Sequence, residues 1–412
     1  MRMNLIRSNR FLALLALYLL AVQFTVGQAP TAKKSSLDTF IEKKMNESGM
    51  VGLGAAIIVN KKLVWTKGYG YADRDNKTLF NPNTIMNIGS ISKTFTGAAL
   101  MRAVEDKKVS LDEDINNYLP FKVINPFFPN ERITLRNLAT HTSGITDRAA
   151  IYKNTYHYGG DSPESLGEFL KNYFEASGKY YSKDNFLKHK SGSYREYSNI
   201  AAALAGYIVE ISTGKKLNAY SKRYIFKPLK MDDTGWFFSE VKLANHSKLY
   251  GKQGDAIKPV QLYGLTTYPD GGVRTSVSDL SKFFICLLNS GEYKGVRILK
   301  RQSAEEMLKF QYSRLNKPEN IELTETNSGI FWATKSGTTR IGHGGGDPGV
   351  KTEMQYDPAK EVGVILFTNT GLSDEAMFKD YFAIFDELWT HALSLKDAET
   401  KDVKAIDRRR KP

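Results

Sequence analysis

The stretch Gly89-Ser90-Ile91-Ser92-Lys93-Thr94-Phe95 opens a predicted helix that continues through Met101. A serine at a helix start faces backbone N–H groups that lack helical partners and the positive end of the helix dipole. Both features stabilise an oxyanion of the kind that forms in acyl transfer. Lys93 follows one turn later on the same face, and we expect burial to lower its proton affinity so that it helps deprotonate Ser90. The stretch therefore predicts a serine nucleophile with a lysine beside it.

The Ser-x-x-Lys spacing occurs three times in the chain, so the spacing alone does not select a nucleophile. The copy Ser212-Thr213-Gly214-Lys215 ends a predicted helix, where a lysine is expected because it interacts favourably with the helix dipole. The copy Ser239-Glu240-Val241-Lys242 lies in an irregular polar stretch. Ser90 could also be a plain helix N-cap without a chemical role. The context of Ser90 favours it as the nucleophile and leaves the N-cap interpretation open.

A second motif, Tyr197-Ser198-Asn199, stands directly before a predicted helix and after the turn Ser191-Gly192-Ser193. A tyrosine near two cations can shift toward phenolate and act as a base. Asn199 is suited to hold a substrate amide. The similarly spaced Tyr152-Lys153-Asn154 is a weaker candidate, because it lies in a polar stretch, 147–193, that we interpret as a surface insertion bordering a cleft.

The third motif is Ile341-Gly342-His343-Gly344-Gly345-Gly346, which leads into a predicted strand that begins at Thr352. Glycines such as Gly345 let a substrate backbone lie against a strand edge. The free N–H of Gly346 is the candidate for a second oxyanion donor. A plain flexible loop would explain the glycines but not the placement of His343 among them.

Predicted strands occur at both ends of the chain, and the middle is mainly helical. Residues 54–59 and 63–66 form one predicted strand pair, and residues 352–356 and 362–369 form another. A long amphipathic helix is predicted over 378–395. We therefore expect an α+β fold, in which both chain ends contribute to one antiparallel sheet flanked by terminal helices and the middle forms a mostly helical lobe.

The motifs Ser90-Ile-Ser-Lys93, Tyr197-Ser-Asn199 and His343-Gly-Gly345 occur in the order found in class C β-lactamases and related DD-peptidases and esterases. The segments 68–73, 133–145 and 269–272 also resemble this family, and the likeness covers roughly residues 37–395. The resemblance implies a β-lactamase/transpeptidase-like fold with the site between the sheet and the helical lobe.

The same resemblance implies a role for each matched residue. Ser90 would be the acylated nucleophile, Lys93 and Tyr197 its proton-transfer partners, and Asn199 and His343 substrate-side groups. β-Lactamases of this class usually carry Lys-Thr-Gly where this chain has His343-Gly-Gly345, which favours a peptidase or esterase over an efficient β-lactamase. His141 is expected to be structural.

The N-terminus resembles an export signal. Three arginines precede the apolar run 11–22, and no acidic residue occurs before Asp38. The run is shorter than the about 20 residues that span a bilayer, and small residues follow at Gly27 and Ala29. We expect a signal peptide (1–29), a linker (30–36), a hydrolase domain (37–395) and a basic disordered tail (396–412). An uncleaved membrane anchor is the alternative.

The sequence thus predicts a secreted or periplasmic acyl-serine hydrolase for an amide, peptide or ester, with a cell-wall D-amino-acid substrate favoured. A true class C-like β-lactamase and a catalytically silent binding protein are the alternatives. The formal charge of +14 comes without a nucleic-acid-binding motif, so we expect no nucleic-acid partner. The histidines lack paired ligand spacing, which predicts no metal and no cofactor. The single cysteine, Cys286, lies in an apolar stretch and is expected to be a buried thiol.

Overall fold

The structure, a computed structural model, describes residues 35–409. The chain divides into two units, 1–39 and 40–412, and the fold given below is that of the second unit. The predicted signal peptide and residues 30–34 of the predicted linker lie outside the described residues. Helix α2 spans Ser36–Ser48. No helix within 35–409 combines the length and apolar character needed to cross a membrane.

Strands from both ends of the chain form one seven-stranded antiparallel sheet in the order β12-β13-β14-β15-β1-β2-β3. Its strands are β1 (Gly52–Val59), β2 (Lys62–Asp73), β3 (Thr78–Leu79), β12 (Ala333–Lys335), β13 (Arg340–Asp347), β14 (Val350–Tyr356) and β15 (Val362–Thr368). Strands β1 and β15 pair directly, from Leu53 with Thr368 to Val59 with Val362. The prediction that the two chain ends share one sheet is confirmed.

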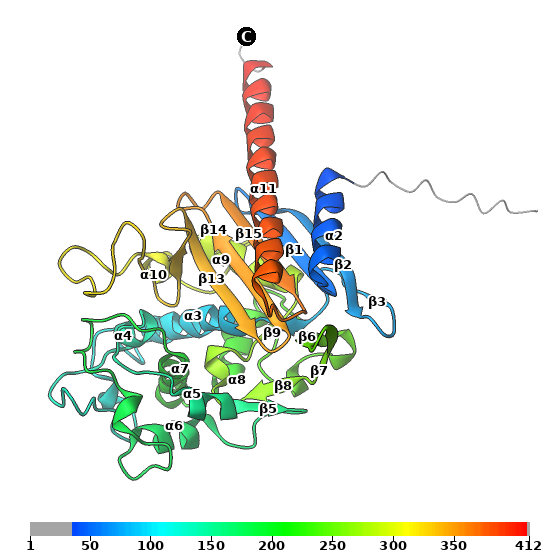
Figure 1. The fold of residues 1–412 in the computed structure, drawn as a ribbon. Helices are drawn as coiled ribbons and strands as arrows, with labels where there is room; N and C mark the ends of the chain where they lie inside the picture. The colour runs from blue at the N-terminus through cyan, green and yellow to red at the C-terminus, as the bar shows by residue number, and fades with distance from the viewer. Residues whose placement is uncertain (1–34, 410–412) are drawn as a thin grey trace, which may run out of the picture. The chain divides into compact units, whose positions relative to one another are not determined.

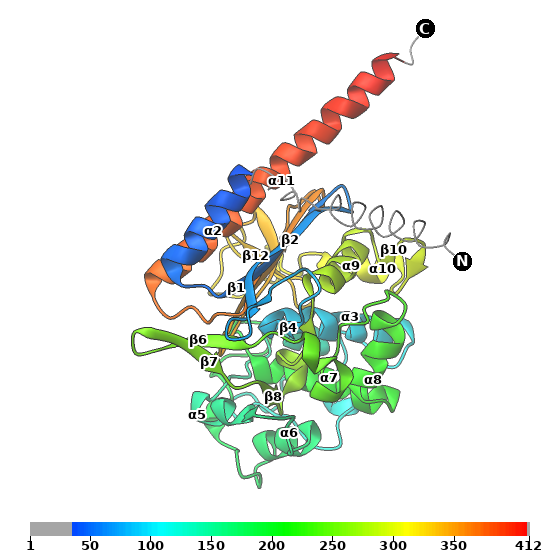
Figure 2. The same cartoon turned by 90° about the vertical axis from the view of Figure 1, so that its right-hand side faces the viewer.

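The central strands β1 and β15 are buried along their whole length, which requires cover on both faces of the sheet. Helix α9 (Val277–Leu288) covers one face and helix α11 (Glu375–Arg409) crosses the other (Figures 1 and 2). Phe284 of α9 packs so closely on Gly363 that an added Cβ there would lie 2.7 Å from the ring. From α11, the Tyr381 hydroxyl donates a hydrogen bond to the backbone of β15.

The middle of the chain forms the predicted helical lobe beside the sheet (Figure 1). Its helices are α3 (Ser92–Glu105), α4 (Leu135–Ala139), α5 (Ala149–Tyr152), α6 (Leu166–Phe174), α7 (Asn199–Thr213) and α8 (Leu217–Ser221). Helix α10 (Arg301–Leu308) packs against α3. Four short strand pairs join the loops: β4 (Met86–Asn87) with β9 (Arg274–Thr275), β5 (Tyr156–Tyr158) with β8 (Tyr263–Leu265), β6 (Leu249–Gln253) with β7 (Ala256–Val260), and β10 (Glu292–Tyr293) with β11 (Val296–Arg297).

Helix α3 is the central element of this lobe, because nearly all of its residues are buried. It packs against α7, whose alanine-rich first turns allow a close approach. Phe95 of α3 stacks on Phe283 of α9 with ring centroids 4.0 Å apart, which joins the lobe to the helix under the sheet. Cys286, on the same helix α9, is a buried free thiol, as predicted. These contacts hold the start of α3 at the boundary between sheet and lobe.

Two expectations about irregular segments are wrong. Residues 396–409, expected to be disordered, continue α11 to Arg409. Two side chains of this segment form ion pairs beside the starts of strands. Lys396 lies 2.5 Å from Glu361, directly before β15, and Glu399 lies 3.2 Å from Lys62, the first residue of β2. The stretch 147–193, expected to be a surface insertion, forms α5, β5 and α6, and its half-buried side chains Asp147, Tyr152 and Tyr156 belong to the site described below.

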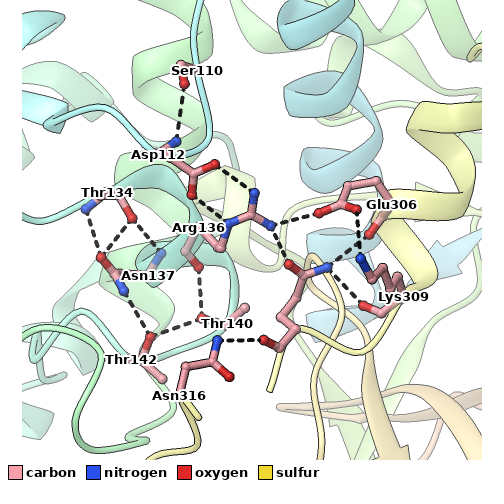
Figure 3. A network of polar contacts seen from close by, with 11 residues as sticks. Ser110, Asp112, Thr134, Arg136, Asn137, Thr140, Thr142, Glu306, Lys309 and Asn316 are labelled. Atoms are coloured by element: carbon pink, nitrogen blue, oxygen red, sulfur yellow. Dashed lines mark hydrogen bonds and ion pairs between the residues drawn. The ribbon is translucent and has the colours of Figure 1, made fainter. Parts of the chain in front are cut away.

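Helix α4 is fixed by a polar network that centres on Arg136 (Figure 3). Its guanidinium makes a two-pronged ion pair with Asp112, at 2.6 and 2.8 Å, and reaches Glu306 of α10 at 2.8 Å. The hydrogen bonds that Arg136 donates to the Asp112 carboxylate raise the pKa of Arg136 above its ordinary value, so the cation is permanent. Thr134 caps the start of α4 through Asn137. The network therefore holds the loop that follows α4, which carries His141.

Candidate active site

Ser90 lies in a 3₁₀ turn, Gly89–Ile91, immediately before α3. Gly89 has φ +53°, a left-handed conformation that strains residues with a side chain. The N-cap of α3 is Ile91, which makes no side-chain cap, and the Ser90 hydroxyl instead accepts a hydrogen bond from Lys93 Nζ at 3.0 Å. The N-cap interpretation of Ser90 is therefore wrong.

Lys93 is completely buried, and its ammonium group has three acceptors. Besides Ser90 Oγ they are Asn199 Oδ1 at 2.6 Å and the backbone oxygen of Asp270 at 2.8 Å. A lysine has three N–H donors only when it is protonated. The hydrogen-bond pattern thus fits a cation whose donors are all used.

The charge state of Lys93 corrects the expectation that burial lowers its pKa. Burial does act in that direction, but Tyr197, Asp270 and Asp147 oppose it, and the pKa lies above the ordinary value of 10.5. The carboxyl groups come from distant parts of the chain and are not visible in the motif. Lys93 is therefore a fixed positive charge in the resting site and not a free base.

Tyr197 lies between this cation and the glycine strand. Its ring is 5.0 Å from Lys93 Nζ, and its ring centroid is 6.2 Å from that of His343. The side chain is 37% exposed, so substrate can reach it. The ring of His141 lies 4.3 Å from that of Tyr197 between centroids, tilted by 33°, and His141 accepts a hydrogen bond from the Ser198 N–H at 3.2 Å. These contacts agree with a structural role for His141, which supports the tyrosine.

Asp147 is the residue that the sequence analysis missed most clearly. Its carboxylate accepts from the Ser198 hydroxyl at 2.8 Å, from the backbone N–H groups of Asn199 and Ile200 at 2.7 and 3.0 Å, and from Asn199 Nδ2 at 2.8 Å. A carboxylate at a helix N-terminus is favoured by the exposed N–H groups and by the helix dipole. Because Asp147 holds Asn199 Nδ2, the amide oxygen faces Lys93. Asn199 thus positions the lysine, and one of its amide hydrogens remains for a substrate.

The glycine motif forms the end of β13 as a free strand edge. Strand β12 pairs only with residues 340–342, and no strand in the described part of the chain pairs with the outer edge of 343–347. A Cβ added to Gly345 would lie 2.2 Å from the backbone oxygen of Ile88, whereas one added to Gly346 would meet nothing within 4 Å. A Cβ added to Gly89, the residue before the nucleophile Ser90, would lie 3.1 Å from the Gly346 nitrogen, so this nitrogen is close to the nucleophile. Gly345 permits the close approach, and Gly346 faces the open site.

His343 is buried and neutral. Burial lowers the pKa of its imidazole well below 6.5, and the nearby cations Lys335 and Lys93 lower it further. Its Nδ1 lies 2.7 Å from the backbone oxygen of Gly344 and donates to it, which leaves Nε2 as an acceptor. His343 therefore offers substrate a hydrogen bond and not a fixed positive charge.

Two further carboxyl groups adjoin the nucleophile. Asp270 accepts a hydrogen bond from the Tyr152 hydroxyl at 2.9 Å, and Asp347 accepts one from Tyr156 at 2.6 Å. Burial raises the pKa of Asp270 to about 7 and that of Asp347 to about 6. The segment Pro269-Asp270-Gly271-Gly272 resembles the family at the sequence level, but nothing local indicated these pairings. No group of residues in the described part of the chain could hold a metal ion.

The structure thus brings all the sequence-predicted site residues together at the start of α3. Ser90 and Lys93 come from the turn and helix α3, Tyr197 and Asn199 from the start of α7, and the glycine edge with His343 from β13. The two alternative serines, Ser212 and Ser239, lie at the end of α7 and in a short 3₁₀ turn. Among the described residues, neither serine hydroxyl bonds to the lysine of its own motif, whereas Ser90 Oγ accepts a hydrogen bond from Lys93.

The chain is similar in sequence to two bacterial proteins, one of which is described as a putative penicillin-binding protein. It is 26% identical over 341 residues to Protein flp of Staphylococcus aureus (strain MRSA252), covering 82% of this chain and 63% of that protein. It is 29% identical over 260 residues to the putative penicillin-binding protein PbpX of Bacillus subtilis (strain 168), covering 61% and 59%. The chain therefore spans less than two thirds of the length of these relatives.

Solved structures share the fold. A penicillin-binding protein homologue from Pyrococcus abyssi superposes with a TM-score of 0.68 at 24% identity, over 87% of this chain and 76% of that one. The D-amino acid amidase of Ochrobactrum anthropi SV3 superposes with a TM-score of 0.66 at 22% identity, over 88% and 100%. The fold is thus β-lactamase/transpeptidase-like, as expected. The family model described as Beta-lactamase matches residues 37–388, and the chain belongs to the Beta-lactamase family.

Proposed function

We propose that the protein is an exported acyl-serine hydrolase that cleaves an amide, peptide or ester bond through an acyl-enzyme on Ser90. A cell-wall D-amino-acid peptide or ester is the favoured substrate. The observation that carries the proposal is the hydrogen bond of 3.0 Å from the Lys93 ammonium to Ser90 Oγ beside a free strand edge. A fixed cation at this point stabilises the charges that develop during acyl transfer.

In the acylation step, Ser90 Oγ attacks the substrate carbonyl carbon and loses its proton. Lys93 cannot accept that proton, because it already carries three, so Tyr197 takes it and must enter the step as the phenolate beside the Lys93 cation. The N–H groups of Ser90 and Gly346 hold the resulting oxyanion. Tyr197 then gives the proton to the leaving group as the bond to the carbonyl carbon breaks.

In the deacylation step, a water molecule attacks the Ser90 ester while Tyr197 takes a proton from it. The acyl–Oγ bond breaks, and the proton returns to Ser90, which restores the starting state. Asp147 supports both steps indirectly, since it orients Asn199 and Asn199 orients Lys93. Every proton lost by one group is thereby taken up by another within the site.

The choice of a D-amino-acid peptide or ester draws on the relatives and on His343. One similar structure is described as a D-amino acid amidase and another as EstCE1, a hydrolase with promiscuous acyltransferase activity. At 19% and 22% identity these two proteins share the fold of this chain, and the substrate preference proposed here rests on the residues of the site. A neutral histidine in place of a lysine removes a fixed cation for the carboxylate of a penicillin.

We therefore expect β-lactams to acylate the protein and to leave it slowly. A chromogenic cephalosporin should give slow steady-state turnover with a persistent acyl adduct, while an ester or D-amino-acid peptide is cleaved faster. Steady-state kinetics and intact-protein mass measure the two quantities. A kcat/KM for the cephalosporin that approaches the diffusional ceiling of about 10⁸ M⁻¹s⁻¹ would identify a dedicated β-lactamase instead.

Export is proposed from the N-terminal sequence, with the mature chain beginning near Gln28 or Pro30. N-terminal sequencing of the protein from its native host should find residues 1–27 removed, because signal peptidase cleaves after small residues. A full-length product in the cytoplasm would contradict export without affecting the chemistry proposed for Ser90.

A further inference from the structure

The free edge of β13 has two chemically different ends. At one end, His343 lies beside Tyr197, with ring centroids 6.2 Å apart. At the other end, one residue beyond Gly346, lies Asp347, which pairs with Val350 across the hairpin. A substrate that lies along this edge therefore has His343 at one end and Asp347 at the other.

The chemistry fixes the direction in which a substrate lies. The leaving group takes its proton from Tyr197, so it must lie toward the His343 end of the edge. The carbonyl oxygen binds near the Gly346 nitrogen, beside Gly89. The acyl part of the substrate therefore extends past Gly346 toward Asp347.

Asp347 carries a charge that the protein leaves unpaired. Its Oδ1 accepts from Tyr156, but Oδ2 has no hydrogen-bond partner, and no ion pair to Asp347 exists in the part of the chain whose side chains are described. Oδ2 lies beside the glycines Gly89 and Gly271. A Cβ added to Gly89 would lie 3.0 Å from Oδ2, and one added to Gly271 would lie 3.7 Å from it. A buried carboxylate oxygen without a partner is costly, and burial accordingly raises its pKa to about 6.

A row of tyrosine rings leads away from this carboxylate. Tyr156, which donates to Asp347, lies 5.3 Å from Tyr263, and Tyr263 lies 5.6 Å from Tyr158 between ring centroids. Tyr158 is 52% exposed, so this group of rings opens to solvent. Aromatic faces next to a carboxylate attract an ammonium group by cation–π and ionic interactions together.

We propose that Asp347 is a specificity-determining residue that binds the free ammonium group of a substrate's acyl part. The substrates would then be amides, esters or peptides of amino acids with an unblocked amino terminus. This inference rests on the proposed function, because it assigns the acyl side of the same Ser90 site. Asp347 acts on substrate choice and takes no part in the proton transfers.

The test compares two p-nitrophenyl esters that differ in one group. The alanine ester carries an ammonium group where the 2-methylpropanoate ester carries a methyl group. The ratio of their kcat/KM values is measured for wild type, Asp347→Asn, and the control Asp255→Asn in the exposed β6–β7 turn. Intrinsic differences in ester reactivity cancel when this ratio is compared between variants.

We expect Asp347→Asn to lower the ratio about 10- to 100-fold, the range for a hydrogen bond to a charged group, and Asp255→Asn to leave it unchanged. Asp255→Asn should also leave the rate with each ester unchanged. An unchanged ratio, or an equal loss with both esters, would overturn the inference alone. Hydrolysis of neither ester by wild type would overturn the proposed function as well.

A second measurement needs only the wild-type protein, in case Asp347→Asn does not fold. The inhibitor 1-aminoethylboronic acid carries the ammonium group, and 2-propylboronic acid is its methyl counterpart. The first should bind at least about tenfold more tightly, for the same reason. Equal inhibition constants would contradict an ammonium site at Asp347.

Discussion

Replacing Ser90 by alanine is expected to lower the turnover of a p-nitrophenyl ester by about 10⁶-fold, as found when another serine hydrolase loses its nucleophile. The structure supplies the reason, because Ser90 Oγ is the acceptor of the Lys93 ammonium and lies beside the Gly346 nitrogen. Kinetics with the purified variant measure the effect.

Matched controls come from the other two Ser-x-x-Lys copies. Ser212→Ala and Ser239→Ala remove the same hydroxyl from the end of α7 and from a 3₁₀ turn, and the turnover should not change. If either control lost activity while Ser90→Ala kept it, the wrong serine would have been assigned. Thermal unfolding of each variant separates loss of chemistry from loss of fold.

Removing the lysine or the tyrosine hydroxyl is expected to have the next largest effect. Lys93→Met keeps most of the side-chain volume but leaves Ser90 Oγ, Asn199 Oδ1 and the Asp270 backbone oxygen without their shared donor. Tyr197→Phe keeps the stacking on His141 and removes only the proton carrier. Tyr197→Phe should lower kcat by about 10²–10⁴-fold, the range for general acid–base groups. Lys93→Met should lower kcat by about 10²–10³-fold, the range for the loss of one electrostatic stabiliser.

Steady-state kinetics with the same ester distinguish this role from substrate binding. A rise in KM with kcat unchanged for both variants would mean that the two side chains only bind substrate. For Lys93→Met, the unfolding temperature is the necessary control, because three buried acceptors lose a hydrogen bond at once.

The fold was largely predictable because strands with alternating or continuous apolar patterns lie at both ends of the chain. Strands predicted at 54–59 and 362–369 appear as β1 and β15, which pair along their length. The tail beyond residue 395 was not predicted correctly. Its helical continuation depends on ion pairs such as Lys396 with Glu361, which join residues far apart in the sequence.

In the site, as in the fold, residues in local sequence motifs could be predicted, whereas contacts between distant parts of the chain could not. Ser90, Lys93 and the motif at Tyr197 are recognisable because their spacing is local. Asp147 and Asp347 were missed because each acts through partners brought close only by folding. The charge state of Lys93 was mispredicted for the same reason, since its burial could be inferred but the opposing carboxyl groups could not.

The central claim is that Ser90 forms the acyl-enzyme, and mass spectrometry after exposure to a fluorophosphonate or a penicillin tests it most directly. Intact wild-type protein should gain the mass of one adduct, and peptide mapping should place the adduct on Ser90. The Ser90→Ala protein should remain unmodified under the same conditions. An adduct that persists in Ser90→Ala, or that maps to Ser212 or Ser239, would contradict the account.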